Sequence, residues 1–90
     1  MLLDEVAVRL NLTPAQLERE SLRVYLERRL RLVESELFAL SQRYGVNTVD
    51  ELDQAIRAGR FHESDAFEDF FRFDYLEAEI DSLQELLARL

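Results

Sequence analysis

Few side chains in this sequence could carry out chemistry. The chain has no cysteine and one histidine, His62, which precedes Glu63 in the segment between Gly59 and Ser64. A thiol nucleophile and a cysteine-based zinc site are therefore excluded, and a histidine-based catalytic triad would have to use His62. A di-iron bundle needs Glu-x-x-His motifs on two helices, and the sequence has no such pair. We therefore expect no catalytic residue, no metal site and no cofactor.

The stretch from residue 67 to 75, FEDFFRFDY, places five aromatic residues among four charged ones. On a helix these rings cannot all face one seam, so Phe70 and Phe73 fit a core, whereas Phe67 and Phe71 lie to the side. One interpretation is a thick aromatic core. The other is an aromatic anchor rimmed by acids, the composition of a surface that binds a basic protein. On that interpretation the partner-binding residues are Phe67, Glu68, Phe71, Asp74, Tyr75, Glu77 and Asp81.

The charge of the chain is unevenly distributed. Residues 1–45 carry seven acids and seven arginines, whereas residues 46–90 carry twelve acids and four arginines and so account for the net charge of -8. An acidic half disfavours nucleic acid as a direct ligand and favours a basic partner, although acidic surfaces also keep small proteins soluble. In the basic cluster from Arg19 to Arg31, Glu27 and Arg31 have the favourable i,i+4 order, which favours a salt-bridged solvent face over a DNA-binding patch.

Helix start and stop signals divide the chain clearly. The segment Thr13–Gln16 combines a capping threonine, a proline at the first helical position and a glutamine three residues after the cap. Gly45 can end this helix in the left-handed conformation. The segment Thr48–Glu51 is a second capping box, Gly59 ends the short helix that it opens, and Ser64 is the expected cap of the last helix.

These signals predict one all-α domain over residues 1–90, a long antiparallel helical hairpin (about 14–44 and 64–90) with two short helices (about 2–10 and 49–58). The first short element is amphipathic, but Val6 and Val8 would also suit a strand. The inner seam of the first long helix is formed by Ala15, Leu22, Leu26, Leu30, Val33, Leu37, Leu40 and Tyr44. The seam of the last helix is formed by Phe70, Phe73, Leu76, Ile80, Leu83, Leu87 and Leu90.

Each long helix also has apolar residues away from its seam, and a two-helix hairpin has one seam. The short helices could cover these residues and close a monomeric bundle, or another chain could cover them. Because each short helix offers one narrow apolar face, we expect association, including a homo-oligomer such as a dimer. The predicted self-association residues are Leu17, Val24, Tyr25, Leu32 and Ala39.

Residues 2–30 resemble the two helices of ribbon-helix-helix proteins. In that family a capped helix carries a Leu…Ala/Ser-Leu-x-x-Tyr-Leu pattern, which is supplied here by Leu17, Ser21, Leu22, Tyr25 and Leu26. The strand that precedes these helices and reads DNA in that family is missing from this sequence.

The remainder resembles small prokaryotic antitoxins of toxin–antitoxin modules. The matching segments are residues 43–46 (RYGV), residues 49–52 (VDEL) and the run from His62 to Leu76. This resemblance implies an antitoxin that masks a basic, ribonuclease-like toxin.

We therefore expect a non-catalytic, antitoxin-like module that binds a basic protein. The alternatives are a structural homo-oligomerising bundle and a transcriptional regulator of ribbon-helix-helix descent. The first residues are acidic where a signal peptide would be basic, and no uncharged stretch approaches the ~20 residues that span a bilayer. A cytoplasmic location without membrane contact is expected.

Overall fold

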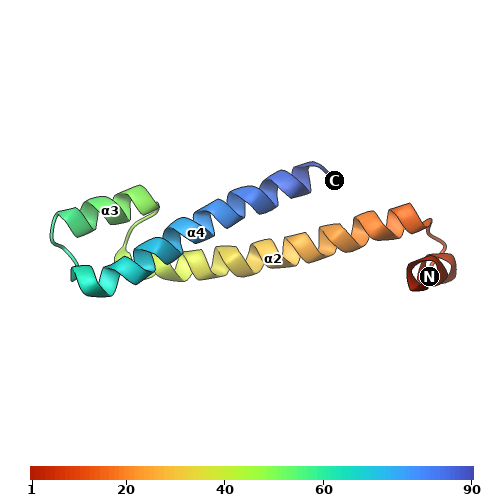
Figure 1. Ribbon diagram of the computed structural model, residues 1–90, viewed down its shortest axis with the longest axis horizontal. Coiled ribbons are helices and arrows are strands. Elements are labelled where there is room, and N and C mark those ends of the chain that lie inside the picture. Colours follow the sequence, from red (N-terminus) through yellow and green to blue (C-terminus); the bar gives the residue numbers. More distant parts are fainter.

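The chain folds into an elongated all-α structure, as the sequence predicts (Figure 1). The structure is a computed structural model that describes the backbone of residues 1–90 and every side chain except those of Glu63 and Asp65. The elements in chain order are α1 (Leu2–Arg9), α2 (Pro14–Tyr44), α3 (Val49–Arg57) and α4 (Glu63–Ala88). The long helices α2 and α4 pack antiparallel, and the molecule measures 60 × 19 × 18 Å.

The ends of α2 form as their local signals predict. The Thr13 side chain accepts a hydrogen bond from the Gln16 amide at 3.1 Å, and the Gln16 side chain accepts one from the Thr13 amide at 2.8 Å. These reciprocal bonds satisfy two amides that have no partner within the helix. At the other end Gly45 takes a left-handed conformation with φ of 65°, which a residue with a side chain adopts at a cost.

The later helix ends differ from the predictions in detail. Thr48 caps α3 by accepting from the Glu51 amide, but the Glu51 carboxylate accepts from the Asn47 amide, so the second box is not closed on Thr48 itself. The prediction that Ser64 caps the last helix is wrong, because α4 begins at Glu63 with His62 as its N-cap residue. Ser64 therefore lies inside the first turn.

The hydrophobic core lies where α2, α3 and α4 meet. Phe73, Leu76 and Leu52 are fully buried there, so α3 closes the end of the hairpin at which the chain reverses (Figure 1). The predicted core positions Phe70 and Ile80 pack against this cluster and are half-buried. The buried cluster consists of Val33, Leu40, Tyr44, Val46, Leu52, Ala66, Phe73, Leu76 and Leu83.

The beginning of α2 extends past the end of α4. Arg23 reaches the carbonyl of Leu90 at 3.4 Å, so the residues before Arg23 have no stretch of α4 beside them. As a consequence, the predicted seam residues Ala15 and Leu22 are exposed. In place of α4, the helix α1 crosses this part of α2 and buries Ala7, which also excludes the strand considered for this segment (Figure 1).

Candidate protein-binding surfaces

The histidine, aspartate and glutamate side chains of the described residues do not converge on one point. Among them, no cluster of three or more histidine, aspartate or glutamate side chains is placed to hold a metal ion. His62 is exposed at the start of α4, and the side chain of its neighbour Glu63 lies outside the described part.

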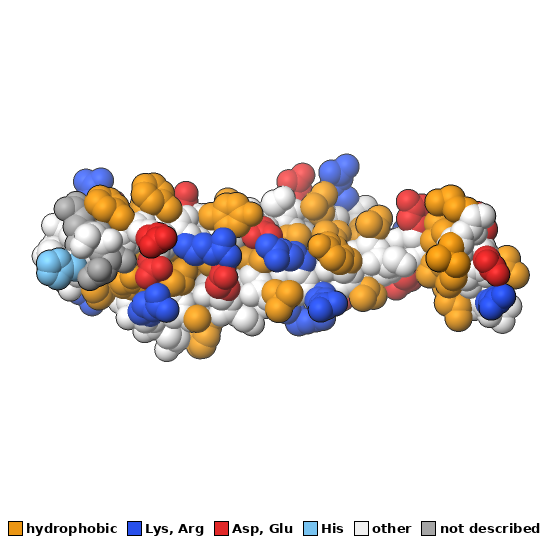
Figure 2. Space-filling view, turned by 60° about the horizontal axis from the view of Figure 1, so that its bottom comes forward, with side chains coloured by type: hydrophobic (Ala, Val, Ile, Leu, Met, Phe, Trp, Pro, Cys, Tyr) orange, Lys and Arg blue, Asp and Glu red, His pale blue; other side chains and the backbone are white. Residues whose placement is uncertain are grey.

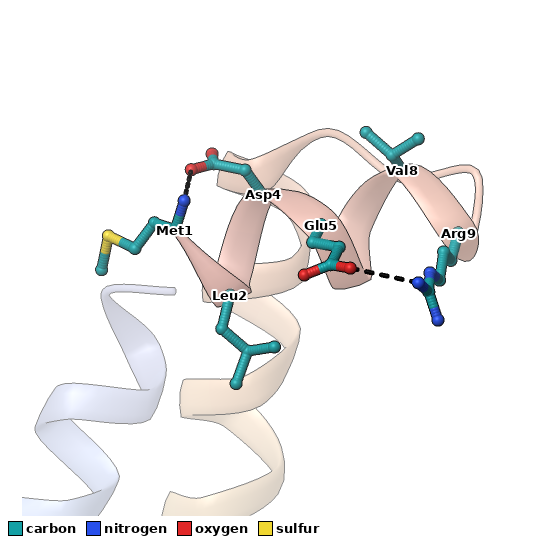
Figure 3. Close-up of a pocket in the computed structure, with 6 residues that line it drawn as sticks. All are labelled: Met1, Leu2, Asp4, Glu5, Val8 and Arg9. Carbon is teal, nitrogen blue, oxygen red and sulfur yellow. Dashed lines mark hydrogen bonds and ion pairs between the residues drawn. The ribbon is translucent and has the colours of Figure 1, made fainter.

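A shallow hollow lies along the exposed surface of α1. As Figure 3 shows, the N-terminal amine faces Asp4 at 3.7 Å, and Arg9 pairs with Glu5 at 3.1 Å. The charged groups neutralise one another within one exposed helix, so no polar set converges on a ligand. The hollow is lined by Met1, Leu2, Asp4, Glu5, Val8 and Arg9.

The first candidate surface is an acidic aromatic ridge on α4. Phe67 and Phe71 stack on one another, with ring centroids 6.4 Å apart and planes 18° apart, yet 48% and 64% of their surfaces remain exposed. Phe73 of the same segment is fully buried, so the structure divides the aromatic stretch between core and surface. We use the name acidic aromatic ridge for Phe67, Glu68, Phe71, Asp74 and Asp81, all of which are exposed.

Glu77, another predicted partner-binding residue, is used inside the fold. Its carboxylate accepts a hydrogen bond from the Val49 amide at 3.2 Å and thereby binds α4 to the first turn of α3. Burial raises the pKa of Glu77, the bond from Val49 opposes this, and the nearby carboxylates of Asp50, Asp74 and Asp81 raise the pKa further. The carboxyl group of Glu77 therefore connects α4 to α3 through an accepted hydrogen bond, while its negative charge is disfavoured at this half-buried position.

The second candidate surface is a row of ion pairs between the two long helices. Arg29 pairs with Glu79 at 2.7 Å, and Arg43 pairs with Asp69 at 2.9 Å. Between these pairs, Arg72 contacts Glu36. We call this side of the hairpin the ion-pair face. Figure 2 shows acidic and basic side chains along it, with hydrophobic side chains next to them.

The hydrophobic side chains of the ion-pair face come from both long helices. Tyr25 and Leu32 lie four residues before and three residues after Arg29, on the same side of α2, and are 66% and 56% exposed. On α4, the ring of Tyr75 lies under the guanidinium of Arg72 at 5.4 Å. A hydrogen bond to Glu79 and the charge of Glu79 raise the pKa of Arg29, and burial opposes this. Tyr25 and Leu32 line a hollow together with Arg29.

The predicted self-association residues therefore do not form one stripe. Leu17 is half-buried beside α1, where it lines a hollow with Leu2, Leu3 and Val6. Tyr25 and Leu32 belong to the ion-pair face, and Ala39, seven residues after Leu32, is exposed on the same side of α2, whereas Val24 is exposed at another position around the helix. Since α3 packs on α4 and α1 packs on the beginning of α2, the short helices leave Val24, Tyr25 and Leu32 uncovered.

Sequence reasoning missed two exposed apolar residues. Phe38 of α2 is 65% exposed although it belongs to neither predicted set, and Leu86 of α4 is 39% exposed. Leu86 lies two turns beyond Glu79, on the side that carries the ion pairs. The signal for both was available, because each falls off the inner seam at helical spacing.

The expected Glu27–Arg31 pair is not formed among the described side chains. Instead, Arg29 of the same cluster pairs with Glu79 on α4.

These features define an all-α hairpin protein with two exposed apolar surfaces of different charge. The chain belongs to the Uncharacterized protein MJ0235 family, whose model matches residues 1–90. No curated protein and no solved structure matches the chain. Within the part of the chain that the structure describes, no helix has the length and apolar composition needed to cross a membrane.

Proposed function

We propose that this protein is a non-catalytic binding module whose acidic aromatic ridge covers a basic protein. The observation that carries the proposal is the stacked pair Phe67 and Phe71, which stays exposed beside a buried core. Large rings that are held rigid on a helix supply contact area at little cost in conformational entropy.

The charge of α4 supports a basic partner. The helix contains nine acids and one arginine. Asp69, Glu77 and Glu79 are engaged with Arg43, the Val49 amide and Arg29, so their negative charge is used within the fold. Of the ridge acids, Glu68 and Asp74 are exposed beside the two rings, and Asp81 is exposed about 15 Å farther along α4. Such a surface attracts a positively charged one and accelerates the encounter at low salt.

The resemblance to antitoxins suggests what this partner is. If it applies, the partner is a basic, ribonuclease-like toxin, and the ridge would neutralise it by covering its basic surface. Co-expression with the product of the adjacent reading frame, followed by size-exclusion chromatography, tests this part of the proposal. A neighbour that neither co-elutes with the protein nor inhibits growth when expressed alone would remove the antitoxin function.

Two matched variants test the ridge itself. Phe71→Asp introduces a charge at its centre and should abolish the complex, while the far-UV circular dichroism of the free protein stays unchanged. Phe38→Asp is the control, because Phe38 is exposed to the same extent, 65% against 64% for Phe71, but lies on α2. We expect Phe38→Asp to bind as the wild type does. Equal affinity of the Phe71→Asp variant and the wild type would refute the proposal.

A further inference from the structure

The ion-pair face offers a second interaction surface that is independent of the ridge. Glu77 and Glu79 are two residues apart on α4 and therefore point to opposite sides of the helix. Glu77 contacts α3, whereas Glu79 contacts Arg29, so α3 covers the side away from the ion pairs. The two long helices run side by side for about 33 Å at ~1.5 Å per residue.

The size of this face suits a stable contact. The face is about 33 Å long and 18 Å wide, so its projected area is about 600 Å². Protruding side chains increase the accessible area toward the ~800 Å² that each partner contributes to a standard interface. The six charged groups of its three ion pairs are already paired within the chain, so a partner that covers these groups does not have to neutralise them.

We propose that a second copy of this chain docks on the ion-pair face, with α2 of each copy lying over α4 of the other. Charge decides this arrangement. On this face α4 contributes Asp69, Arg72 and Glu79, a net charge of -1, whereas α2 contributes Arg29, Glu36 and Arg43, a net charge of +1. Stacking α4 on α4 would oppose like charges, but stacking α2 on α4 opposes complementary ones. A half-turn about an axis parallel to the hairpin produces this arrangement twice in one symmetric dimer.

The ion pairs set which residues meet. Arg29 and Glu36 are seven residues apart on α2. Their partners Glu79 and Arg72 are seven residues apart on α4, which runs in the opposite direction. A rotation about the long axis does not change a residue's position along that axis. Leu32 of one copy therefore lies at about the same position along the axis as Tyr75 of the other. The same register places Tyr25 level with residue 83 of the second copy, about 4.5 Å along the axis from Leu86. The large exposed apolar side chains of the face thereby lie near one another.

Cross-linking tests both the dimer and its orientation. Because the chain has no cysteine, single introduced cysteines are unique. The variants Leu32→Cys and Tyr75→Cys, carrying different tags, are co-expressed and treated with a short bifunctional thiol cross-linker. We expect a linked species that contains both tags, and little product from either variant alone. If Leu32→Cys alone gives as much product, α2 lies over α2 and the proposed orientation is wrong.

Matched controls separate the dimer from random collision and from the ridge. Phe38→Cys combined with Tyr75→Cys should give no linked species, and product equal to that of the test pair would overturn the proposal. By light scattering the wild type and Phe38→Asp should be dimers. The dimer dissociation constant of Leu32→Asp should be at least ten-fold higher than that of the wild type. A wild type that stays monomeric at all concentrations would overturn the proposal. Leu32→Asp should still bind the basic partner, so the two proposals fail separately.

Discussion

The substitution Tyr44→Phe tests how the closed end of the hairpin is held. Tyr44 is 8% exposed, its ring packs edge-on against Phe61 with centroids 4.9 Å apart, and its hydroxyl donates a hydrogen bond to Asp69. Phenylalanine keeps the ring and removes the hydroxyl. A hydrogen bond to a charged group contributes about 1.5–3 kcal/mol. Because Asp69 keeps its ion pair with Arg43, we expect the lower value, about 1.5 kcal/mol. For a chain of this length that loss lowers Tm by roughly 8 °C.

The same substitution should change how stability depends on pH. Burial raises the pKa of Tyr44, and the hydrogen bond to Asp69 and its charge raise it further. A raised pKa favours the neutral phenol in the folded state, so the contribution is fully present below the unfolded value of about 10 and is lost as pH rises through the folded pKa. The stability difference between wild type and Tyr44→Phe should therefore be largest near neutral pH and shrink in strong alkali.

Urea unfolding followed by circular dichroism, at one protein concentration and from neutral to alkaline pH, measures both effects. All other titrating groups are common to the two proteins, so the difference isolates Tyr44. An unchanged unfolding free energy at neutral pH would refute the assigned hydrogen bond. A difference that grows with alkaline pH would refute the sign of the pKa argument.

Four further changes probe other parts of the fold by the same unfolding assay. Phe73→Ala should cost about 3–5 kcal/mol because Phe73 is fully buried, and a loss below ~1 kcal/mol would contradict its place in the core. Gly45→Ala should cost about 1–2 kcal/mol through its left-handed backbone alone, since a Cβ there meets no other atom. Thr13→Ala should cost about 1 kcal/mol through the lost cap. Glu77→Gln should be more stable than wild type at neutral pH. Because the pKa of Glu77 is raised in the folded state, the stability that its neutral form contributes below the unfolded pKa is lost as the pH rises. The stability advantage of the variant should vanish in acid, and an advantage that persists there would contradict the argument.

The interaction surfaces depend on how the fold uses its acids. An acidic helix would present a uniform negative surface if all its carboxylates faced solvent. In this structure Asp69 and Glu79 bind α2 on the ion-pair face, and Glu77 binds α3 on the other side of α4. Of the remaining exposed acids, Glu68 and Asp74 lie within one turn of Phe71, whereas Asp81 and Glu85 lie farther along α4. The helix therefore has distinct sides instead of a uniform negative surface.

The sequence by itself determined the helices and the positions at which they end. Capping boxes and a left-handed glycine act within four or five residues, so Thr13, Thr48 and Gly45 specify helix ends without reference to distant parts of the chain. Periodicity likewise identified Phe73 and Leu76 as core residues, because the seam of a helix is a local pattern. The predicted cap of α4 is two residues from the observed one, His62, because Ser64 has the composition of a cap without occupying that position.

Only the tertiary structure decided which off-seam residues stay exposed and which acids serve the fold. Leu22 belongs to the seam by spacing but is exposed, because α4 ends beside Arg23. Glu77 matches the exposed acids in type, yet it meets the Val49 amide because α3 folds back on that side of α4. These outcomes depend on where distant segments pack, and local propensity does not encode that information.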